Sequence, residues 1–260
     1  MKKIMFVAVA ALAASCFAEV TSANTVGYKT INVSAGTMVG MGVQFQDVAN
    51  ETSIAVTNLL SIPAADQKGA NAFAAGADQI WVWDVANKEW KYYFFRKQGA
   101  KVIGWCKKNE TAVTTDTLNN GDGFFFVRPS TGAAVVTLNG AVNCTDSTVP
   151  TAIAAGTMTF MTYPWPLSYP IASFTNNVPV ADQKGANAFA AGADQIWIWD
   201  VANKEWKQYF FRKQGTKVIG WCKKGETTVT EDAIEPGTCF FFVRPSTGAT
   251  TVTFTKPASL

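Results

Sequence analysis

The chain of 260 residues contains no histidine. This absence excludes Ser-His-Asp and Cys-His nucleophile systems. It also removes the commonest metal ligand and the usual general base near neutral pH. No two cysteines lie within four residues of each other, so zinc sites of the CxxC type are missing, and so are the glycine-rich phosphate loops GxGxxG and GxxxxGK[ST]. We therefore expect no metal, no cofactor and no enzyme activity of these classes.

Long apolar runs are also scarce, and the one at the N-terminus is short. Lys2 and Lys3 precede an apolar run over residues 4–14, and Cys16 and Ala18 place small side chains at the −3 and −1 positions of a cleavage after Ala18. This pattern is typical of a secretory signal peptide, and the run is shorter than the about 20 residues that span a bilayer. We expect an exported protein, in the periplasm, at the cell surface or outside the cell, without a transmembrane span in the mature chain. Lipidation at Cys16 is the alternative, because residues 12–16 loosely resemble a lipobox.

Charge is low and nearly balanced. Cleavage after Ala18 removes two of the 22 basic residues and none of the 19 acidic ones, which leaves 20 − 19, or +1. A near-neutral chain lacks the electrostatic footprint of a nucleic-acid-binding protein.

Four cysteines remain after such a cleavage. An even number in an exported protein predicts disulfides, and four cysteines allow three connectivities. We favour Cys222–Cys239 and Cys106–Cys144; free, buried thiols are the alternative.

An internal repeat dominates the sequence. Residues 65–137 match residues 181–253 at an offset of 182 − 66 = 116 without a gap, with 73 − 14 = 59 identical positions. Upstream the match decays, and Gly36 pairs with Gly156 at an offset of 120. Each unit is domain-sized, so we read a tandem duplication: a signal peptide over 1–18, repeat 1 over 19–140, a linker over 141–152 and repeat 2 over 153–260.

Strand signals dominate each repeat. Tryptophans alternate with aliphatic residues over 80–85, a polar turn follows, and residues 90–95 run back, which predicts a β-hairpin over 80–95. Further strands are expected over 101–106, 124–127 and 134–138, and one short helix over 52–60. We predict an all-β protein of two tandem small β-sandwich or partly open β-barrel domains, with one short helix in each as an option.

The repeat motifs resemble a known family. Each unit contains Asp-Gln-Ile-Trp-(Val/Ile)-Trp-Asp, then Gly-Trp, then Phe-Phe-Phe-Val-Arg, and in repeat 1 these motifs are preceded by Asn24-Thr25-Val26-Gly27-Tyr28. In these features the chain is similar to exported β-rich tandem-repeat proteins of unknown function found in verrucomicrobial and related bacteria. The resemblance implies an all-β fold and export and supplies no catalytic residues. Thr238-Cys239 departs from the Asp122-Gly123 of repeat 1.

Paired carboxylates are the enzymatic option that remains, because glycoside hydrolysis needs only two. The candidates are Asp78, Asp84, Glu89 and Glu110, with Asp194, Asp200, Glu205 and Glu226 in repeat 2. Several of them flank a predicted turn, where acidic side chains are usually solvated turn formers, so we expect no catalytic residue among them.

Aromatic side chains are the best candidates for ligand binding. Sugar rings stack on such side chains, and neighbouring amides and acids bond their hydroxyl groups. The candidates are Trp81, Trp83, Trp90, Tyr92 and Trp105 in repeat 1, and Trp197, Trp199, Trp206 and Trp221 in repeat 2. The alternative is core packing, since aromatic residues also favour strands and fill cores. Tyr92 is Gln208 in repeat 2, which favours a solvent-facing strand face containing Trp90 and Tyr92.

A basic cluster is the second candidate site. It comprises Arg96, Lys97, Lys101, Lys107 and Lys108, and then Arg212, Lys213, Lys217, Lys223 and Lys224. Such a cluster could bind an anionic polysaccharide or a phospholipid surface; a solvated hairpin edge is the alternative.

Together these features favour an exported non-catalytic binding or adhesion protein whose partner is a glycan or an envelope component. Carbohydrate is the expected ligand class. Two alternatives remain at this stage: a structural envelope or matrix protein that self-assembles, and a carboxylate-based glycan hydrolase.

Overall fold

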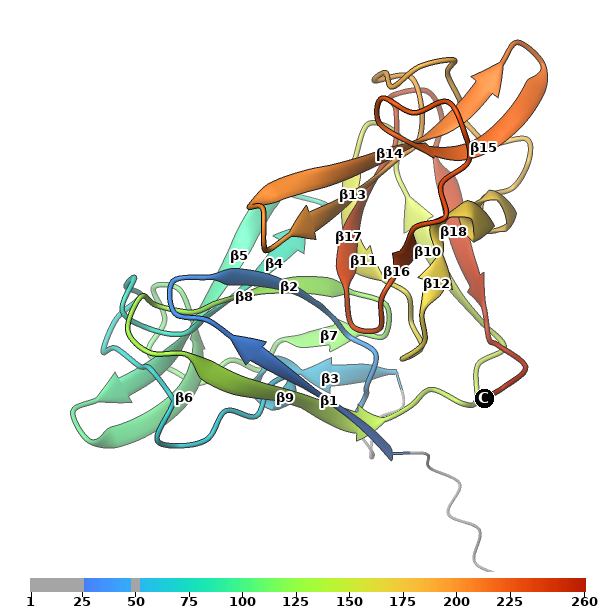
Figure 1. The fold of residues 1–260 in the computed structure, drawn as a ribbon. Helices are drawn as coiled ribbons and strands as arrows, with labels where there is room; N and C mark the ends of the chain where they lie inside the picture. Colours follow the sequence, from blue (N-terminus) through green and yellow to red (C-terminus); the bar gives the residue numbers. More distant parts are fainter. Residues whose placement is uncertain (1–25, 48–51) are drawn as a thin grey trace, which may run out of the picture.

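The computed structural model describes residues 26–47 and 52–260, and in this range the chain is almost entirely β-structure (Figure 1). The prediction of an all-β protein with two β domains is confirmed. We call the part up to residue 141 repeat 1 and the part from residue 148 repeat 2. The signal pattern and Cys16 lie outside the described residues.

In its described part, repeat 1 contains nine strands and one 3-10 helix. They are β1 (Val26–Val33), β2 (Met38–Gly42), β3 (Ser53–Ala55), η1 (Val56–Asn58), β4 (Gln79–Asp84), β5 (Glu89–Gln98), β6 (Lys101–Lys107), β7 (Thr117–Asn119), β8 (Gly123–Val127) and β9 (Ala134–Ala141). The helix expected over 52–60 is thus a short strand followed by a single 3-10 turn.

Repeat 2 has the same order of elements. They are β10 (Thr148–Ile153), β11 (Met158–Thr162), β12 (Tyr169–Pro170), η2 (Ile171–Asn176), β13 (Gln195–Asp200), β14 (Glu205–Gln214), β15 (Lys217–Lys223), β16 (Ala233–Ile234), β17 (Cys239–Val243) and β18 (Thr250–Thr255). Strand β10 occupies the end of the segment expected to be a linker, because residues 148–153 pair with β18.

Each repeat is built on a five-stranded antiparallel sheet. The strand order is β2-β8-β4-β5-β6 in repeat 1 and β11-β17-β13-β14-β15 in repeat 2. Pairs of short strands lie beside each sheet: β1-β9 and β3-β7 in repeat 1, β10-β18 and β12-β16 in repeat 2. The hairpin predicted over 80–95 is confirmed, since β4 and β5 pair from Gln79↔Phe94 to Asp84↔Glu89.

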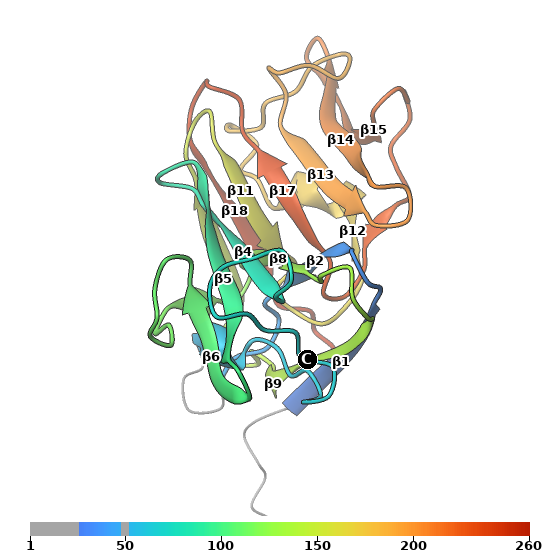
Figure 2. The ribbon, with the colours of Figure 1, turned by 90° about the vertical axis from the view of Figure 1, so that its left-hand side faces the viewer.

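The alternation of side chains gives each five-stranded sheet two different faces. One face points into the repeat and carries fully buried residues such as Ile80, Tyr93, Phe124 and Phe126. These residues form one apolar cluster that includes side chains of β1, β9 and η1 and continues into repeat 2. The two repeats therefore share a continuous core, and Figure 2 shows their sheets side by side.

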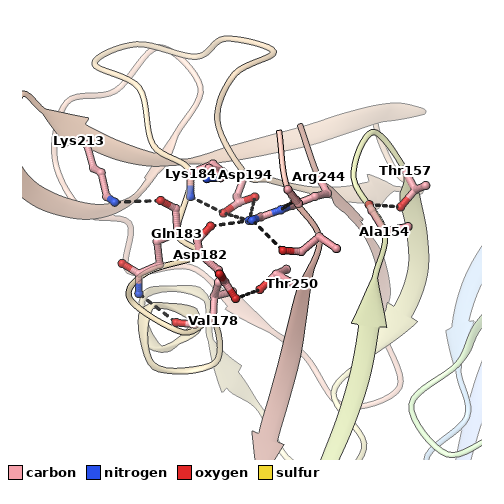
Figure 3. Close-up of polar contacts among 12 residues, drawn as sticks. Ala154, Thr157, Val178, Asp182, Gln183, Lys184, Asp194, Lys213, Arg244 and Thr250 are labelled. Carbon is pink, nitrogen blue, oxygen red and sulfur yellow. Dashed lines mark hydrogen bonds and ion pairs between the residues drawn. The ribbon is translucent and has the colours of Figure 1, made fainter. Parts of the chain in front are cut away.

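A buried arginine ties the loops of each repeat together. In repeat 2, Arg244 Nη1 lies 2.7 Å from Asp194 Oδ1, and both side chains are at most 1% exposed (Figure 3). The same guanidinium donates to the carbonyl oxygens of Asp182, Gly248 and Ala249. Arg128 and Asp78 form the equivalent pair in repeat 1, also at 2.7 Å. These contacts explain why the loop motifs recur almost unchanged in both copies.

The expected disulfides are not formed. All four described cysteines are free, so the pairings Cys222–Cys239 and Cys106–Cys144 are wrong. Cys106 and Cys222 each pack in a separate small cluster beneath a loop of their own repeat, whereas Cys239 lies between the repeats. Cys106, Cys222 and Cys239 serve as small buried apolar side chains, which is the alternative that the sequence left open, whereas Cys144 is partly exposed.

In the two described ranges, no helix has the length and apolar character needed to cross a membrane.

Candidate functional site

The tryptophans of both hairpins lie where the two repeats meet. Trp83 Nε1 donates to the carbonyl oxygen of Met158 at 2.7 Å, and Trp199 Nε1 donates to that of Met38 at 3.3 Å. The equivalent residues thus exchange equivalent contacts, which is the pattern of a two-fold interface. Trp90 continues it, with its ring 5.8 Å from Phe160 of the other repeat.

These aromatic side chains pack around one cluster that both repeats share. It contains Phe125, Phe160, Cys239 and Phe241, with Trp81, Trp83, Trp90, Trp197, Trp199 and Trp206 partly buried against it. Tyr92 is also partly buried, with its ring 5.2 Å from Trp81. The face singled out for ligand stacking therefore lies largely in contact with the other repeat.

The two sides of this interface have complementary shapes. A Cβ atom on Gly40 would lie 2.5 Å from Cys239 Sγ, and one on Gly123 would lie 3.1 Å from Phe160 Cδ1. When the two repeats are aligned, Phe160 is the counterpart of Gly40, at an offset of 160 − 40 = 120. Cys239 is the counterpart of Gly123, at an offset of 239 − 123 = 116. Repeat 1 has a glycine where repeat 2 has the side chain that fills the space.

The other two tryptophan candidates face the interior of their own repeats. Trp105 is 4% exposed and packs on Phe95, with ring centroids 5.5 Å apart. Trp221 is fully buried in repeat 2, against Phe211 and Phe174. Of the nine aromatic candidates, Trp105 is the one that lines the pocket described next.

A pocket of about 620 Å³ opens in repeat 1 between η1, β6 and β9. Apolar side chains line it together with amides, hydroxyls and one carboxylate. The described lining includes Ile54, Leu60, Ile62, Phe95 and Trp105, and the polar groups Gln46, Asp47, Thr57, Asn58, Ser61, Gln67 and Asn139.

Local hydrogen bonds hold part of the polar rim. Asp47 Oδ1 accepts from Asn58 Nδ2 at 3.2 Å, and Asp47 Oδ2 accepts from the Ala55 amide at 3.3 Å. Gln67 Nε2 donates to the Ile62 carbonyl at 3.0 Å. Gln46 differs: it is 1% exposed, and its Oε1 accepts no hydrogen bond from any group in the described ranges. A buried acceptor without a donor is unusual in a folded protein.

The corresponding segment of repeat 2 carries a larger ring. Phe174 in η2 is completely buried, and its ring lies 5.9 Å from Trp221 and 5.4 Å from Phe240. The pairings Ile54↔Leu118 and Tyr169↔Ile234 align β3 with β12 at an offset of 169 − 54 = 115, so Phe174 takes the place of the buried Leu59. The two repeats therefore differ in side-chain size at this core position.

Most residues of the basic cluster make local structural contacts. Arg96 donates to the carbonyl oxygens of Asn71 and Thr111, and Lys97 Nζ donates to that of Gln67 at 3.0 Å. Lys107 lies 3.0 Å from Asp116, and Lys108 lies about 5 Å from the centres of the Tyr92 and Phe73 rings.

Repeat 2 uses its basic residues in the same way. Arg212 and Lys213 donate to carbonyl oxygens of neighbouring loops, and Lys224 Nζ donates to Gln208 Oε1 at 2.7 Å. Lys101, Lys217 and Lys223 lie on the paired strands β6 and β15 of the two edge hairpins. The cluster is thus spread over hairpins and loops, and none of its members is among the described lining residues of the repeat 1 pocket.

The four aspartates among the candidate carboxylates, Asp78, Asp84, Asp194 and Asp200, are each in an ion pair. Asp84 lies 2.7 Å from Lys91 Nζ and accepts hydrogen bonds from the hairpin-turn amides of Ala86 and Asn87. These contacts, led by the Lys91 hydrogen bond, hold the pKa of Asp84 well below its usual range. Asp200 and Lys207 repeat this pair. Within the described ranges, no group of three or more acidic or cysteine side chains is placed to hold a metal ion.

Comparison with known proteins identifies no relative: no family model, no curated protein and no solved structure matches the chain.

The sequence alone missed most of the pocket. Its polar residues come from residues 46–47, 57–61 and 67 and from β9, and the sequence does not distinguish them from ordinary surface positions. One signal was present, because the match between the repeats decays upstream of residue 65. The pocket uses that diverged segment.

Proposed function

We propose that the chain is an exported, non-catalytic carbohydrate-binding protein whose site is the pocket of repeat 1. The observation that carries this proposal is the combination, in one pocket lining, of apolar side chains that include Trp105 with several amides and hydroxyls. Ligand sites combine an apolar lining with a few polar groups that fix orientation. A sugar ring supplies both an apolar C–H face and hydroxyl donors.

The charge of the pocket favours neutral sugars. Asp47 is the single charged side chain among its described lining residues, and its oxygens already accept hydrogen bonds from Asn58 and Ala55. An anionic glycan would find no basic partner among these residues. A neutral or N-acetylated sugar finds amide donors and acceptors instead.

Calorimetric titration with β-1,4-linked oligomers of glucose, xylose and N-acetylglucosamine tests the proposal, with tryptophan fluorescence as a second readout because Trp105 lines the pocket. We expect binding by at least one series with a shift in emission. Asn58→Phe should reduce it at least tenfold, since it places a bulky ring among the residues that line the pocket.

Asn176→Phe is the matched control, because Asn176 ends η2 as Asn58 ends η1 and is exposed outside the pocket. It should bind as the wild type does. Silence across all three series, or equal binding by the Asn58→Phe variant, would overturn the proposal.

A further inference from the structure

One exposed ring lies outside the pocket and next to it. Tyr28 on β1 is 78% exposed, and it is the one aromatic residue among the strongly exposed large apolar side chains of the described chain. It belongs to the Val26-Gly27-Tyr28 motif at the start of repeat 1, and neither the core nor the inter-repeat interface uses its ring. A fully solvated tyrosine ring on a regular strand is available as a stacking surface.

Strand register brings this ring close to the pocket. Tyr28 pairs directly with Asn139 of β9, and Asn139 lines the pocket. Directly opposed residues of an antiparallel pair point to the same face, with Cβ atoms about 5 Å apart. Both residues are exposed, so the ring and the amide share the outer face of the β1-β9 pair.

Strand β9 lies between the pocket and strand β1, which carries Tyr28. On one of its edges Ala141 pairs with Gln46 and Thr137 pairs with Ser61, and both Gln46 and Ser61 line the pocket. On its other edge lies β1. An oligosaccharide that leaves the pocket over Asn139 therefore reaches the face of Tyr28 after crossing one strand.

We propose that Tyr28 is a second subsite, so that the site selects an extended neutral oligosaccharide rather than a single sugar. One end of the chain occupies the pocket, and a more distant sugar ring stacks its C–H face on Tyr28. The inference rests on the proposed function, because Tyr28 can stack on a more distant sugar ring only when the same oligosaccharide also occupies the pocket. Repeat 2 offers no such stacking surface, since the position equivalent to Tyr28, at 28 + 120 = 148, is Thr148, which has no ring.

The test is a length series of the same three oligomer families, from one to six units, titrated against full-length wild type and Tyr28→Ala. For the wild type we expect affinity to rise with length. Tyr28→Ala should bind the longest oligomer about tenfold more weakly while binding of the shortest one is unchanged. Tyr28→Phe should keep the length dependence, because it keeps the ring.

The controls distinguish a failure of the second subsite from a failure of the proposed function. Val180→Ala removes an equally exposed apolar side chain in repeat 2 and should leave every affinity unchanged. If short and long oligomers bind wild type and Tyr28→Ala equally, the second subsite does not exist and the pocket remains. If no oligomer binds any variant, the proposed function itself fails.

Discussion

Gly40 of repeat 1 lies so close to Cys239 of repeat 2 that a Cβ atom at position 40 would stand 2.5 Å from the sulfur. This contact shows why the repeats diverged at two of their interface positions. The tryptophan-rich faces of both hairpins pack around the same cluster.

Filling this space should destabilise the protein. We expect Gly40→Ala to lower the free energy of unfolding by about 1–3 kcal/mol, the usual effect of overpacking a well-packed interior. Urea unfolding measures it through the transition midpoint. Gly76→Ala is the control, because a Cβ atom there meets nothing within 4 Å.

A second substitution tests the partner directly. Cys239→Gly removes the clashing side chain, so the double variant with Gly40→Ala should recover part of the loss. Independent, additive effects of the two substitutions would contradict a direct contact between positions 40 and 239.

The protonation of Asp122 should make stability depend on pH. Burial raises the pKa of this carboxyl to about 6, above the value near 3.9 of an unfolded chain. The folded state therefore binds the proton more tightly. The resulting stability is present below about pH 4, is lost as the pH rises towards 6, and amounts to roughly 3 kcal/mol over that window.

Asp122→Asn removes this titration and keeps an oxygen that can accept the hydrogen bond from the Asn119 amide. Unfolding measured between pH 4 and 7 should show the wild type losing stability relative to the variant. Glu205→Gln, at an exposed hairpin position, should follow the wild type. Parallel curves for wild type and Asp122→Asn would show that the carboxyl does not titrate in this range.

Removing one charge of the buried ion pair between Asp78 and Arg128 should lower the stability of the protein far more than removing a surface charge. Asp78→Asn leaves the Arg128 guanidinium buried beside a neutral amide, and removal of one partner of such a pair costs about 3–5 kcal/mol. Asp194→Asn should act alike on Arg244. Thermal unfolding measures both, and the exposed Glu89→Gln is the control, which should be nearly neutral. Equal melting temperatures for all three variants would contradict a structural role of the pair.

Thiol labelling should identify four separate cysteines. Cys144 is partly exposed, whereas Cys106, Cys222 and Cys239 are buried, and burial raises the pKa of these three thiols. Because the thiolate is the reactive form, we expect an alkylating reagent to modify Cys144 first, with peptide mapping by mass spectrometry as the measurement. Peptides joined by Cys222–Cys239 or Cys106–Cys144 under non-reducing conditions would contradict the free thiols.

The local structure could be predicted well from the sequence because its signals are short-range. Alternating Trp81 and Trp83, the polar turn after Asp84 and the returning strand from Trp90 specify a hairpin without reference to the rest of the chain. The strand β10 was missed because Pro150 and the surrounding polar residues resemble a linker, and their strand exists through pairing with β18.

Which residues cover each face of the sheets could not be predicted in the same way. Period-two alternation shows that Trp90 and Tyr92 share a face, but what covers that face depends on residues of the other repeat, such as Phe160. The pocket has the same difficulty, since it joins Gln46, Trp105 and Asn139 from distant parts of the chain. The fold follows from local patterns, whereas the site follows from tertiary contacts.

The glycines facing Phe160 and Cys239 carry a genetic consequence. Two halves that remain identical at 59 of 73 aligned positions, 73 − 14, are prone to recombine with each other and become uniform. A chain with Cys239 and its counterpart both as cysteine would crowd the centre of the molecule, and one with both as glycine would leave it hollow. Two halves with the same residue at this position should therefore fold less stably than the natural chain, whichever of the two residues both halves carry.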